Sequence, residues 1–370
     1  MKAWALHDIG NIRLEDIEKP EVGTGEVLVA VKAAGICGSD IPRIYKTGAY
    51  SHPLIPGHEF SGIVTEIGAG VEDRWLGKRV GIFPLIPCRT CVPCQRKQYE
   101  MCRQYGYLGS RRDGGFAELT AVPVGNLIEL PDTVSFEEAA MLEPMAVAVH
   151  AMRRISPKSS DTVTVCGLGT IGLLLLMFLR EAGIENILAV GNKTFQKRMV
   201  LEAGLSADNF CNSKETDVDT WLMERTGGKG TDIFFECVGT DRTLTYAIAN
   251  TAPAGRVMLV GNPASNMTLE KTVYWKILRN QLTVMGTWNS SFTFDAQAKS
   301  ARFRRSGEDR REIDVPVDDW RYVLERLGEG KIRPECLISH RYTLEELEQG
   351  FHIMRDKTQN YGKVMMCMEE

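Results

Sequence analysis

The sequence has no long apolar run, no large excess of charge and no internal repeat. Its longest apolar stretch extends from Ile171 to Leu179 and is broken by Gly172, which is about half of the ~20 residues that a membrane-spanning helix needs. The charge is nearly balanced, with 44 basic residues, 48 acidic residues and a net charge of −4. Bulk charge therefore argues against a nucleic acid or an anionic membrane as a partner.

The first residues also lack the apolar region of a secretory signal peptide, because His7 and Asp8 follow soon after Met1. Ten cysteines could suggest disulfides, but disulfides belong mainly to exported proteins. Four of the cysteines are clustered, which favours metal binding in a chain without an export signal. With 370 residues, the chain is long for a single core. We therefore expect a cytoplasmic enzyme of two domains.

The first 130 or so residues predict a small, barrel-like β domain. Candidate strands rich in β-branched or alternating residues lie at residues 26–31, 60–67, 77–83 and 115–122. Glycine and proline separate them at short intervals, as in small β-barrels. After the last strand, a capping-box pattern at Ser135–Glu138 opens a helix. We expect this helix to continue and to carry Glu143 near its end.

Four cysteines between two of these strands predict a structural zinc site. Cys88, Cys91 and Cys94 recur at every third position, and Cys102 follows. This spacing can close a tetrahedral four-thiolate site, which has no open position. The alternatives are scattered core cysteines or a redox pair. Zinc-ribbon nucleic-acid modules usually have two separated Cys-x-x-Cys pairs in a basic context, which differs from this pattern.

A second candidate zinc site combines side chains from three separated segments. Cys37 offers a thiol, His58 an imidazole, and Glu59 and Glu143 offer carboxylates. Three protein ligands of these kinds leave a fourth zinc position for water or substrate. Taken singly, Cys37 could be a small buried residue and His58 a core histidine. Glu143 alone, followed by a proline, could be an ordinary carboxylate at a helix end.

From about residue 150, strands and helices alternate. The apolar strand at 162–166 leads into the glycine-rich turn at 167–172 and then into a helix at 173–182. A dinucleotide fingerprint requires this context, because its glycines let backbone N–H groups and the helix N-terminus approach a pyrophosphate. Further candidate strands lie at residues 186–190, 232–238, 256–260 and 282–286. These segments predict a doubly wound parallel sheet, so the fold class is α/β.

The end of the second strand of this region favours NADP(H) over NAD(H). NAD-binding domains usually place an acidic residue there, on the adenosine ribose, but no Asp or Glu follows until Glu202. Gly191 is expected to leave room for a 2′-phosphate, Asn192 to donate hydrogen bonds and Lys193 to add positive charge. Alternatively, Asn192 binds the ribose of NAD and Lys193 faces solvent. The candidate cofactor-binding residues are Gly167, Gly169, Thr170, Ile171, Gly172, Gly191, Asn192, Lys193 and Arg198.

The remainder of the chain contains a basic stretch and three further elements. The basic stretch at 299–311 is interpreted as a solvated loop or helix face. A helix with Val323 and Leu327 on one face is expected to end at Gly328. A last helix, capped at 343–346, and a final strand at 364–368 complete the chain.

With these residues identified, nearly the whole chain resembles the zinc-dependent medium-chain dehydrogenase/reductase family, and within it the polyol branch. The matching motifs are Cys37-Gly38-Ser39-Asp40, Gly57-His58-Glu59, the cysteine quartet, the segment 109–118, Leu142-Glu143-Pro144 and the glycine turn. The resemblance implies a GroES-like catalytic domain at 1–150 and 287–370, interrupted by a Rossmann domain at 151–286. It also implies a homodimer or homotetramer.

The resemblance further implies a mechanism. Zinc on Cys37, His58 and Glu143 would bind a substrate hydroxyl and lower its pKa, so that hydride can leave for the nicotinamide. Glu59 would exchange with Glu143 or with water at the metal. Asp40 would orient His58, and Ser39 would pass the substrate proton outward. In the alcohol-dehydrogenase branch this relay continues to a histidine, but Pro42 stands at that place here.

The expected substrate is a small polyol or sugar derivative oxidised at a secondary carbon, with a phosphorylated polyol such as galactitol 1-phosphate as one option. The phosphate would bind Ser110, Arg111 and Arg112, since the planar fork of arginine suits phosphate. These arginines could instead form surface ion pairs. Two other functions compete: a zinc-free quinone or enoyl reductase of the same fold, and a non-catalytic zinc-ribbon binding protein.

Overall fold

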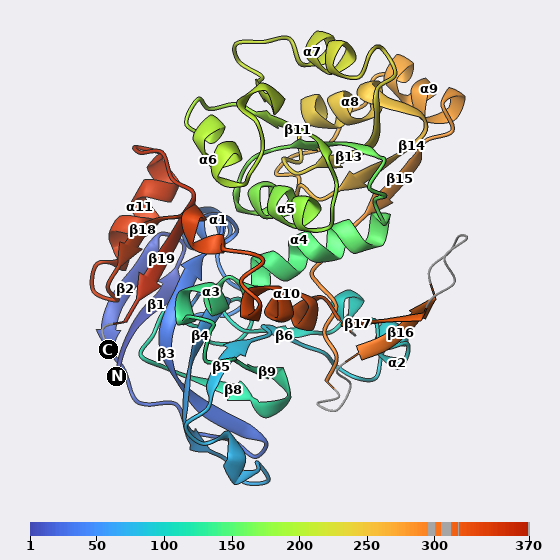
Figure 1. Ribbon diagram of the computed structural model, residues 1–370. Helices are drawn as coiled ribbons and strands as arrows, with labels where there is room; N and C mark the ends of the chain where they lie inside the picture. Colours follow the sequence, from blue (N-terminus) through green and yellow to red (C-terminus); the bar gives the residue numbers. More distant parts are fainter. Residues whose placement is uncertain (295–299, 305–311, 317, 369–370) are drawn as a thin grey trace. The chain divides into compact units, whose positions relative to one another are not determined.

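Strands from both ends of the chain form one sheet, and strands from its middle form another (Figure 1). The computed structural model describes residues 1–294, 300–304, 312–316 and 318–368. Within these ranges the chain divides into two units. Unit 1 comprises Met1–Ala146 and Ser290–Glu370, and unit 2 comprises Val147–Asn289.

The main sheet of unit 1 has seven strands in the order β18-β19-β3-β4-β5-β9, with β8 also paired to β3. All of its pairs are antiparallel except β18 with β19. Its strands are β3 (Glu26–Ile36), β4 (Glu59–Ile67), β5 (Arg79–Ile82), β8 (Leu119–Pro123), β9 (Leu127–Glu129), β18 (Ile338–Tyr342) and β19 (Lys363–Cys367). The last strand therefore lies against the first long strand, which brings the C-terminal segment to the Cys37 loop.

Three two-stranded ribbons and several short helices complete unit 1. The ribbons are β1 (Lys2–Asp8) with β2 (Asn11–Asp16), β6 (Leu85–Ile86) with β7 (Gly106–Tyr107), and β16 (Ser300–Arg304) with β17 (Glu312–Pro316). The α-helices are α1 (Asp40–Pro42), α2 (Val92–Gln95), α3 (Phe136–Ala140), α10 (Asp319–Gly328) and α11 (Leu347–Asp356), and α4 (Leu142–Ile155) continues into unit 2. The other helical turns are η1 (Arg43–Thr47), η2 (Asp73–Trp75), η3 (Tyr99–Met101), η4 (Val124–Asn126) and η6 (Pro334–Leu337).

The core of unit 1 joins the N-terminal ribbon to the C-terminal helix. Trp4 packs edge-on against Phe351 of α11, with ring centroids 5.7 Å apart, and Phe116 contacts the same ring at 5.5 Å. The Trp4 indole N–H donates to the carbonyl of Leu344 at 2.7 Å, so this buried polar group is satisfied. Residues about 340 positions apart therefore share one apolar cluster.

Unit 2 contains a six-stranded, all-parallel sheet in the order β12-β11-β10-β13-β14-β15. Its strands are β10 (Thr162–Cys166), β11 (Asn186–Gly191), β12 (Phe210–Asn212), β13 (Thr231–Glu236), β14 (Thr251–Leu259) and β15 (Thr283–Gly286). Its helices are α5 (Thr170–Glu181), α6 (Gln196–Glu202), α7 (Val218–Arg225), α8 (Asp241–Asn250) and α9 (Lys271–Arg279), with one 3-10 turn, η5 (Ala207–Asn209). The predicted doubly wound parallel sheet is confirmed.

Two sequence predictions about unit 1 were wrong in detail. The helix opened by Ser135 ends at Ala140, and Glu143 lies instead in the first turn of α4. Pro144 explains the break, because proline is tolerated only in the first turn of a helix. The strand predicted at 115–122 begins at Leu119. The N–H groups of Gly115 and Phe116 donate to the carbonyls of Gly57 and Pro56, so this segment closes a loop rather than extending the strand.

The basic stretch at 299–311 lies mostly outside the described residues. Only the backbone of Ser300–Arg304 is described there, as strand β16. Within the described residues, no helix is long and apolar enough to cross a membrane.

Candidate active site

A tight hydrogen-bonded turn after β3 holds Cys37 and Asp40. The Cys37 N–H donates to Asp40 Oδ2 at 2.9 Å, and the Arg43 guanidinium donates to Asp40 Oδ1 at 2.7 Å. Ser39 Oγ donates to Cys37 Sγ at 3.3 Å. Asp40 is fully buried, yet its pKa stays below the usual range because His58 and Arg43 outweigh the effect of burial. The turn therefore presents the sulfur of Cys37 from a fixed backbone.

His58 lies just before β4 and faces this turn. Gly57 has φ +93°, and a Cβ on it would lie 2.6 Å from the Phe116 ring, so only glycine fits before His58. His58 Nδ1 lies 3.3 Å from Asp40 Oδ1, although the angle is not that of a hydrogen bond. Burial opposes the charged form of His58, but Asp40 and Cys37 raise its pKa. With Nδ1 turned to Asp40, Nε2 is the nitrogen left to bind a metal.

Two carboxylates lie at this site, and they have different partners. Potential ligand atoms of Cys37, His58 and Glu59 all lie within 4.8 Å of one another. Glu143 is not in this group, and its Oε1 accepts from the Tyr107 hydroxyl at 3.0 Å. Burial raises the pKa of Glu143 to about 7, with a further contribution from Glu59. A thiol, an imidazole and a carboxylate fit the ligand chemistry of a zinc site with one exchangeable position.

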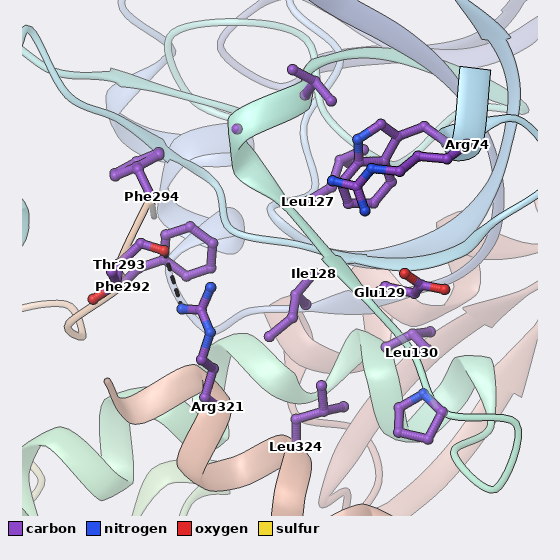
Figure 2. A pocket seen from close by; sticks show the side chains of 14 residues that line it. Arg74, Leu127, Ile128, Glu129, Leu130, Phe292, Thr293, Phe294, Arg321 and Leu324 are labelled. Atoms are coloured by element: carbon purple, nitrogen blue, oxygen red, sulfur yellow. Dashed lines mark hydrogen bonds between the residues drawn. The ribbon is translucent and has the colours of Figure 1, made fainter. Parts of the chain in front are cut away.

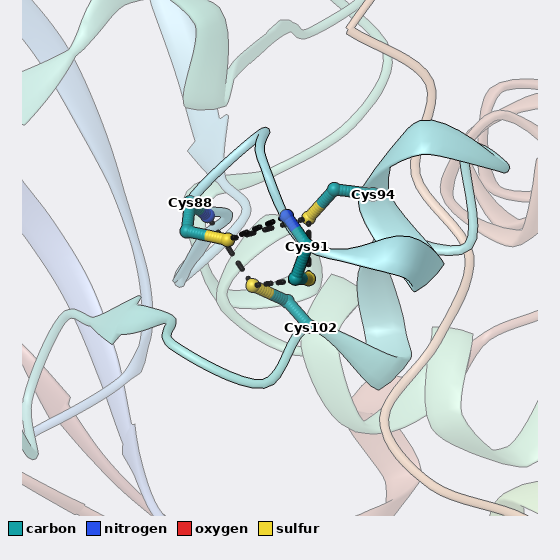
Figure 3. A group of neighbouring side chains, drawn as sticks. All are labelled: Cys88, Cys91, Cys94 and Cys102. Atoms are coloured by element: carbon teal, nitrogen blue, oxygen red, sulfur yellow. Dashed lines mark hydrogen bonds between the residues drawn. The ribbon is translucent and has the colours of Figure 1, made fainter.

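The four clustered cysteines converge within one loop (Figure 3). The Sγ–Sγ distances are 3.5 Å for Cys91–Cys94 and 3.9 Å for both Cys88–Cys94 and Cys91–Cys102. Tetrahedral zinc with Zn–S bonds near 2.3 Å requires about 3.8 Å. The thiol of Cys94 has its pKa raised to about 12 by burial, and that of Cys88 has its pKa lowered to about 5 by hydrogen bonds from Thr90. The sulfur geometry fits a closed four-thiolate site.

The three predicted substrate residues have different surroundings. Ser110 is buried. Arg112 donates to Glu26 Oε1 at 2.7 Å in an ion pair. The Arg111 guanidinium carbon instead lies 3.8 Å from the Tyr50 ring centroid and 4.6 Å from that of Tyr105. Arg111 thus contacts two aromatic rings, whereas Arg112 forms the surface ion pair that was the alternative.

Aromatic contacts connect Arg111 to the candidate metal site. The Tyr105 ring contacts the Tyr107 ring at 6.0 Å between centroids, and Tyr107 contacts the His58 ring at 5.7 Å. These tyrosines were not predicted from the sequence. Their alternation at positions 105 and 107, beside the cysteine loop, was the available signal.

In unit 2, each glycine of the fingerprint has its own structural reason. Gly167 has φ +102°. A Cβ on Gly172 would lie 1.9 Å from the carbonyl oxygen of Gly167, so α5 can approach β10 this closely only with glycine. Gly169 is the N-cap residue of α5, and a Cβ there would meet no atom within 4 Å. This open backbone at a helix N-terminus is where a pyrophosphate would approach.

Gln196 occupies the end of β11. Its Oε1 accepts from the N–H groups of Asn192 and Lys193 at 2.9 and 3.0 Å, and its Nε2 donates to the Leu168 carbonyl. A Cβ on Gly191 would lie 2.4 Å from Gln196 Oε1. The Gln196 side chain therefore fills the space that was expected to be free beside Gly191. Its buried amide satisfies the backbone N–H groups of the turn.

A cavity of about 480 Å³ lies along these strand ends. Of the predicted cofactor residues, its walls include Gly167, Gly169, Gly191, Asn192 and Lys193. Thr170, Ile171 and Gly172 lie in the first turn of α5 and are not among these walls. Arg198 is 80% exposed and pairs with Glu202. The walls also contain Lys214 and Arg242, which sequence analysis missed, because both follow strands with no recognised motif.

A second cavity, of about 540 Å³, lies in unit 1, and none of the candidate metal ligands lines it (Figure 2). Phe292, Phe294 and Leu127 form apolar walls, and Arg321 donates to the Thr293 carbonyl at 3.1 Å beside them.

Two segments of the sequence match known family models. Residues 23–132 match the alcohol dehydrogenase GroES-like domain, and residues 170–303 match the zinc-binding dehydrogenase model. Galactitol 1-phosphate 5-dehydrogenase of Escherichia coli K12 is 32% identical over 370 residues, covering 99% of each chain.

Solved structures agree with these matches. The crystal structure of galactitol-1-phosphate dehydrogenase from Escherichia coli has a TM-score of 0.87 and 31% identity, covering 99% of this chain and 100% of that one. A zinc-binding dehydrogenase from Sinorhizobium meliloti 1021, bound to NADP, has a TM-score of 0.85 and 27% identity, covering 99% and 98%. The chain belongs to the zinc-dependent medium-chain dehydrogenase/reductase family, as its motifs predicted.

Proposed function

We propose that this zinc-dependent dehydrogenase transfers hydride between NADP(H) and a secondary alcohol of a phosphorylated polyol. The observation that supports the substrate class is Arg111, whose guanidinium contacts the rings of two tyrosines in the same unit as the candidate metal ligands. The galactitol 1-phosphate relative supports the same class. Residues 1–150 and 287–370 would form the catalytic domain, and 151–286 the nucleotide-binding domain.

In this proposal Cys37, His58 and Glu143 hold the catalytic zinc. When bound, zinc polarises the substrate oxygen and lowers its pKa, and the nicotinamide accepts or supplies the hydride. Asp40 fixes the orientation of the His58 ring. Ser39 is exposed and next to the sulfur of Cys37, so it can accept the substrate proton and release it to solvent.

Arg111 would bind the phosphate of the substrate. Its guanidinium carbon lies over the Tyr50 and Tyr105 rings, and such cation–π contacts do not use the N–H groups, which can still donate to oxygen atoms. A stacked guanidinium loses less conformational freedom on binding than a mobile one. Arg112 is excluded from this role because it is paired with Glu26.

The preference for NADP(H) would come from basic side chains at the cavity of unit 2. Lys193, Lys214 and Arg242 all line this cavity, and none of the described residues in its walls is acidic. Positive charge favours the 2′-phosphate of NADP, whereas the carboxylate that repels it in NAD-specific domains is missing. Asn192 remains the candidate donor to the ribose.

Two further parts of the proposal concern stability and assembly. The quartet Cys88, Cys91, Cys94 and Cys102 would hold a second, structural zinc ion. The chain would form a homodimer or homotetramer through the edge strand β15, which pairs only with β14 in the described part of the chain.

A substrate survey tests the function. Freshly purified, unchelated enzyme is assayed with paired phosphorylated and plain hexitols, and with NADP and NAD. We expect two zinc ions per chain and the highest kcat/KM for a phosphorylated polyol with NADP. Equal kcat/KM for phosphorylated and plain polyols would reject the phosphate assignment. A kcat/KM with NAD that equals or exceeds that with NADP would reject the cofactor assignment.

A further inference from the structure

Glu59 and Glu143 could each complete the candidate metal site, but they are held by partners of different kinds. Glu59 Oε2 forms an ion pair with Lys363 Nζ, and both side chains are only 2% exposed. Glu143 accepts a hydrogen bond from a neutral phenol, that of Tyr107. Glu59 nevertheless lies within reach of the other ligands, because it belongs to the group whose ligand atoms lie within 4.8 Å.

Lys363 is fixed by more than its ion pair. Its Nζ also donates to the carbonyl of Ile36 at 3.0 Å. The pair packs against the backbone of Gly35, where a Cβ would lie 2.5 Å from both Glu59 Oε2 and Lys363 Cε. Gly35 in β3 faces Met365 of β19 in the sheet register, so the position of the lysine is set by the sheet.

The two partners differ in how easily they release a carboxylate. Moving Glu59 from Lys363 to a metal leaves the buried Lys363 ammonium without its partner in a low-dielectric interior, which is strongly unfavourable. Releasing a carboxylate from a phenol breaks only one hydrogen bond with a neutral donor. A metal ion bound by Cys37 and His58 can therefore recruit Glu143 more easily than Glu59.

We propose that Lys363 is a positioning residue that withholds Glu59 from the metal. Glu143 is then the carboxylate ligand, and one coordination position stays available to the substrate. The inference rests on the proposed function, since it assumes metal at Cys37 and His58. Lys363, at the start of β19, thereby influences metal coordination. The sequence motifs do not indicate this role.

The test replaces Lys363 by methionine, which has a similar length and no charge. Cobalt is exchanged into the catalytic site, and its visible absorbance reports both metal retention and the coordination shell. We expect Glu59 to bind the metal in Lys363→Met. Chelator-driven loss of cobalt should then slow by about tenfold or more, and kcat should fall by a similar factor, within the range of outer-shell mutations. The spectrum should no longer respond to polyol.

Two further variants separate this role from a purely structural one. Lys363→Arg keeps the charge and should restore the wild-type spectrum and most of kcat. Lys363→Met/Glu59→Gln removes both members of the pair, which buried sites often tolerate. It should regain the spectral response to polyol, because no second carboxylate remains to occupy the position.

Glu59→Gln, together with Lys363→Met/Glu59→Gln, which leaves no unpaired buried charge, decides the question even if Lys363→Met does not fold. Unchanged cobalt retention in Glu59→Gln supports the inference, and loss that is about tenfold faster overturns it, since Glu59 would then be a ligand. Unaltered retention and spectrum in a folded Lys363→Met also overturn it. Failure of the proposed function gives a different result, namely wild-type protein that binds no metal at Cys37 and His58.

Discussion

Two consecutive arginines in this chain have opposite environments. Arg111 forms cation–π contacts with Tyr50 and Tyr105, whereas Arg112 forms an ion pair with Glu26. Adjacent positions on one loop therefore provide a variant and its matched control. Both substitutions remove one positive charge from nearly the same place, so bulk electrostatics cannot explain a difference between them.

Arg111→Ala should weaken the binding of phosphorylated polyols specifically. Hydrogen bonds to charged groups typically contribute about 1.5–3 kcal/mol, so KM for a phosphorylated polyol should rise about 10- to 100-fold. KM for the plain polyol should change little, and steady-state kinetics with both substrates measures the difference. Arg112→Ala should leave both values near wild type. Equal KM values for Arg111→Ala and wild-type enzyme with the phosphorylated substrate would contradict the assignment.

The cofactor preference can be tested at Asn192 more cleanly than at Gly191. A side chain on Gly191 would collide with Gln196, so loss of activity there would not report on specificity. Asn192 is exposed at the cavity wall, and Asp has the same shape. Asn192→Asp should lower the ratio of kcat/KM for NADP over NAD by about tenfold or more, because a carboxylate there repels the 2′-phosphate. Lys197→Asp, on the exposed face of α6, is the control that should leave the ratio unchanged.

The sequence predicted the roles of some residues and not those of others. Motif spacing was sufficient to single out Cys37, His58 and the cysteine quartet. Lys363 was missed because a lysine at the start of an apolar strand is usually an exposed end residue. Gln196 was missed as well, since its role depends on backbone N–H groups whose direction no local pattern specifies.

At the scale of elements, the cysteine loop has little apolar support of its own. Its helical turns α2 and η3 are only four and three residues long, and their apolar side chains Val92 and Met101 are exposed. Cys91→Ser should therefore lower the thermal unfolding midpoint by several degrees, given about 2–4 °C per kcal/mol for a unit of this size. Zinc content should fall by one ion per chain.

Cys336→Ser is the control for this substitution. Cys336 is exposed and lies outside the loop. A wild-type midpoint and a wild-type zinc content for Cys91→Ser, measured by calorimetry and metal analysis, would contradict a structural zinc ion at the quartet.

Helix α3 is connected to strand β18 by a bidentate ion pair that predicts a pH dependence. Arg341 Nε and Nη2 donate to Glu137 at 2.7–3.0 Å, and Arg341 holds the pKa of Glu137 below its ordinary value. A lowered pKa in the folded state stabilises the protein above the unfolded pKa of about 4.3. This contribution disappears as the pH falls through the folded value.

Urea unfolding of wild type and Glu137→Gln checks this dependence. The pair is partly exposed, so the difference should stay at or below about 1 kcal/mol near pH 7. It should persist down to about pH 5 and vanish at lower pH. A difference that grew as the pH fell would contradict the sign of the shift.

Helices and strands were predicted correctly where adjacent residues carried the signal, and incorrectly where the signal came from elsewhere in the chain. The capping box at Ser135 and the strand–glycine–helix unit at 162–181 were recognised from adjacent residues. The end of α3 at Ala140 was missed, because the apolar run continues through Met141 and Leu142 without a stop signal. The break is a response to Pro144 and to the start of a second helix.

At the scale of the whole molecule, local sequence patterns could not predict which distant strands pair. Strand β19 pairs with β3, which is more than 300 residues earlier. Only the family resemblance implied that the chain returns to its first domain. This return is what brings Lys363 to Glu59, so the fold itself assembles the site.

Assembly of two chains is the last property that the structure makes testable. In unit 2, β15 pairs only with β14 among the described residues, so one edge of the sheet has unpaired backbone groups. Proteins usually protect such an edge with charges or cover it. Here the preceding helix α9 has no buried residue and exposes Tyr274, Trp275 and Leu278, the last at 58%.

An open edge beside an exposed apolar helix predicts a symmetric dimer through this part of unit 2. Leu278→Glu places a charge on that surface and should shift wild-type oligomers towards monomers at micromolar concentration, measured by analytical ultracentrifugation. Leu76→Glu changes an equally exposed leucine of unit 1, at 56%, and should leave the mass unchanged. Since both substitutions add the same charge, only a specific interface predicts different outcomes. An unchanged mass for Leu278→Glu would exclude α9 from the interface, and a monomeric wild type would exclude the assembly.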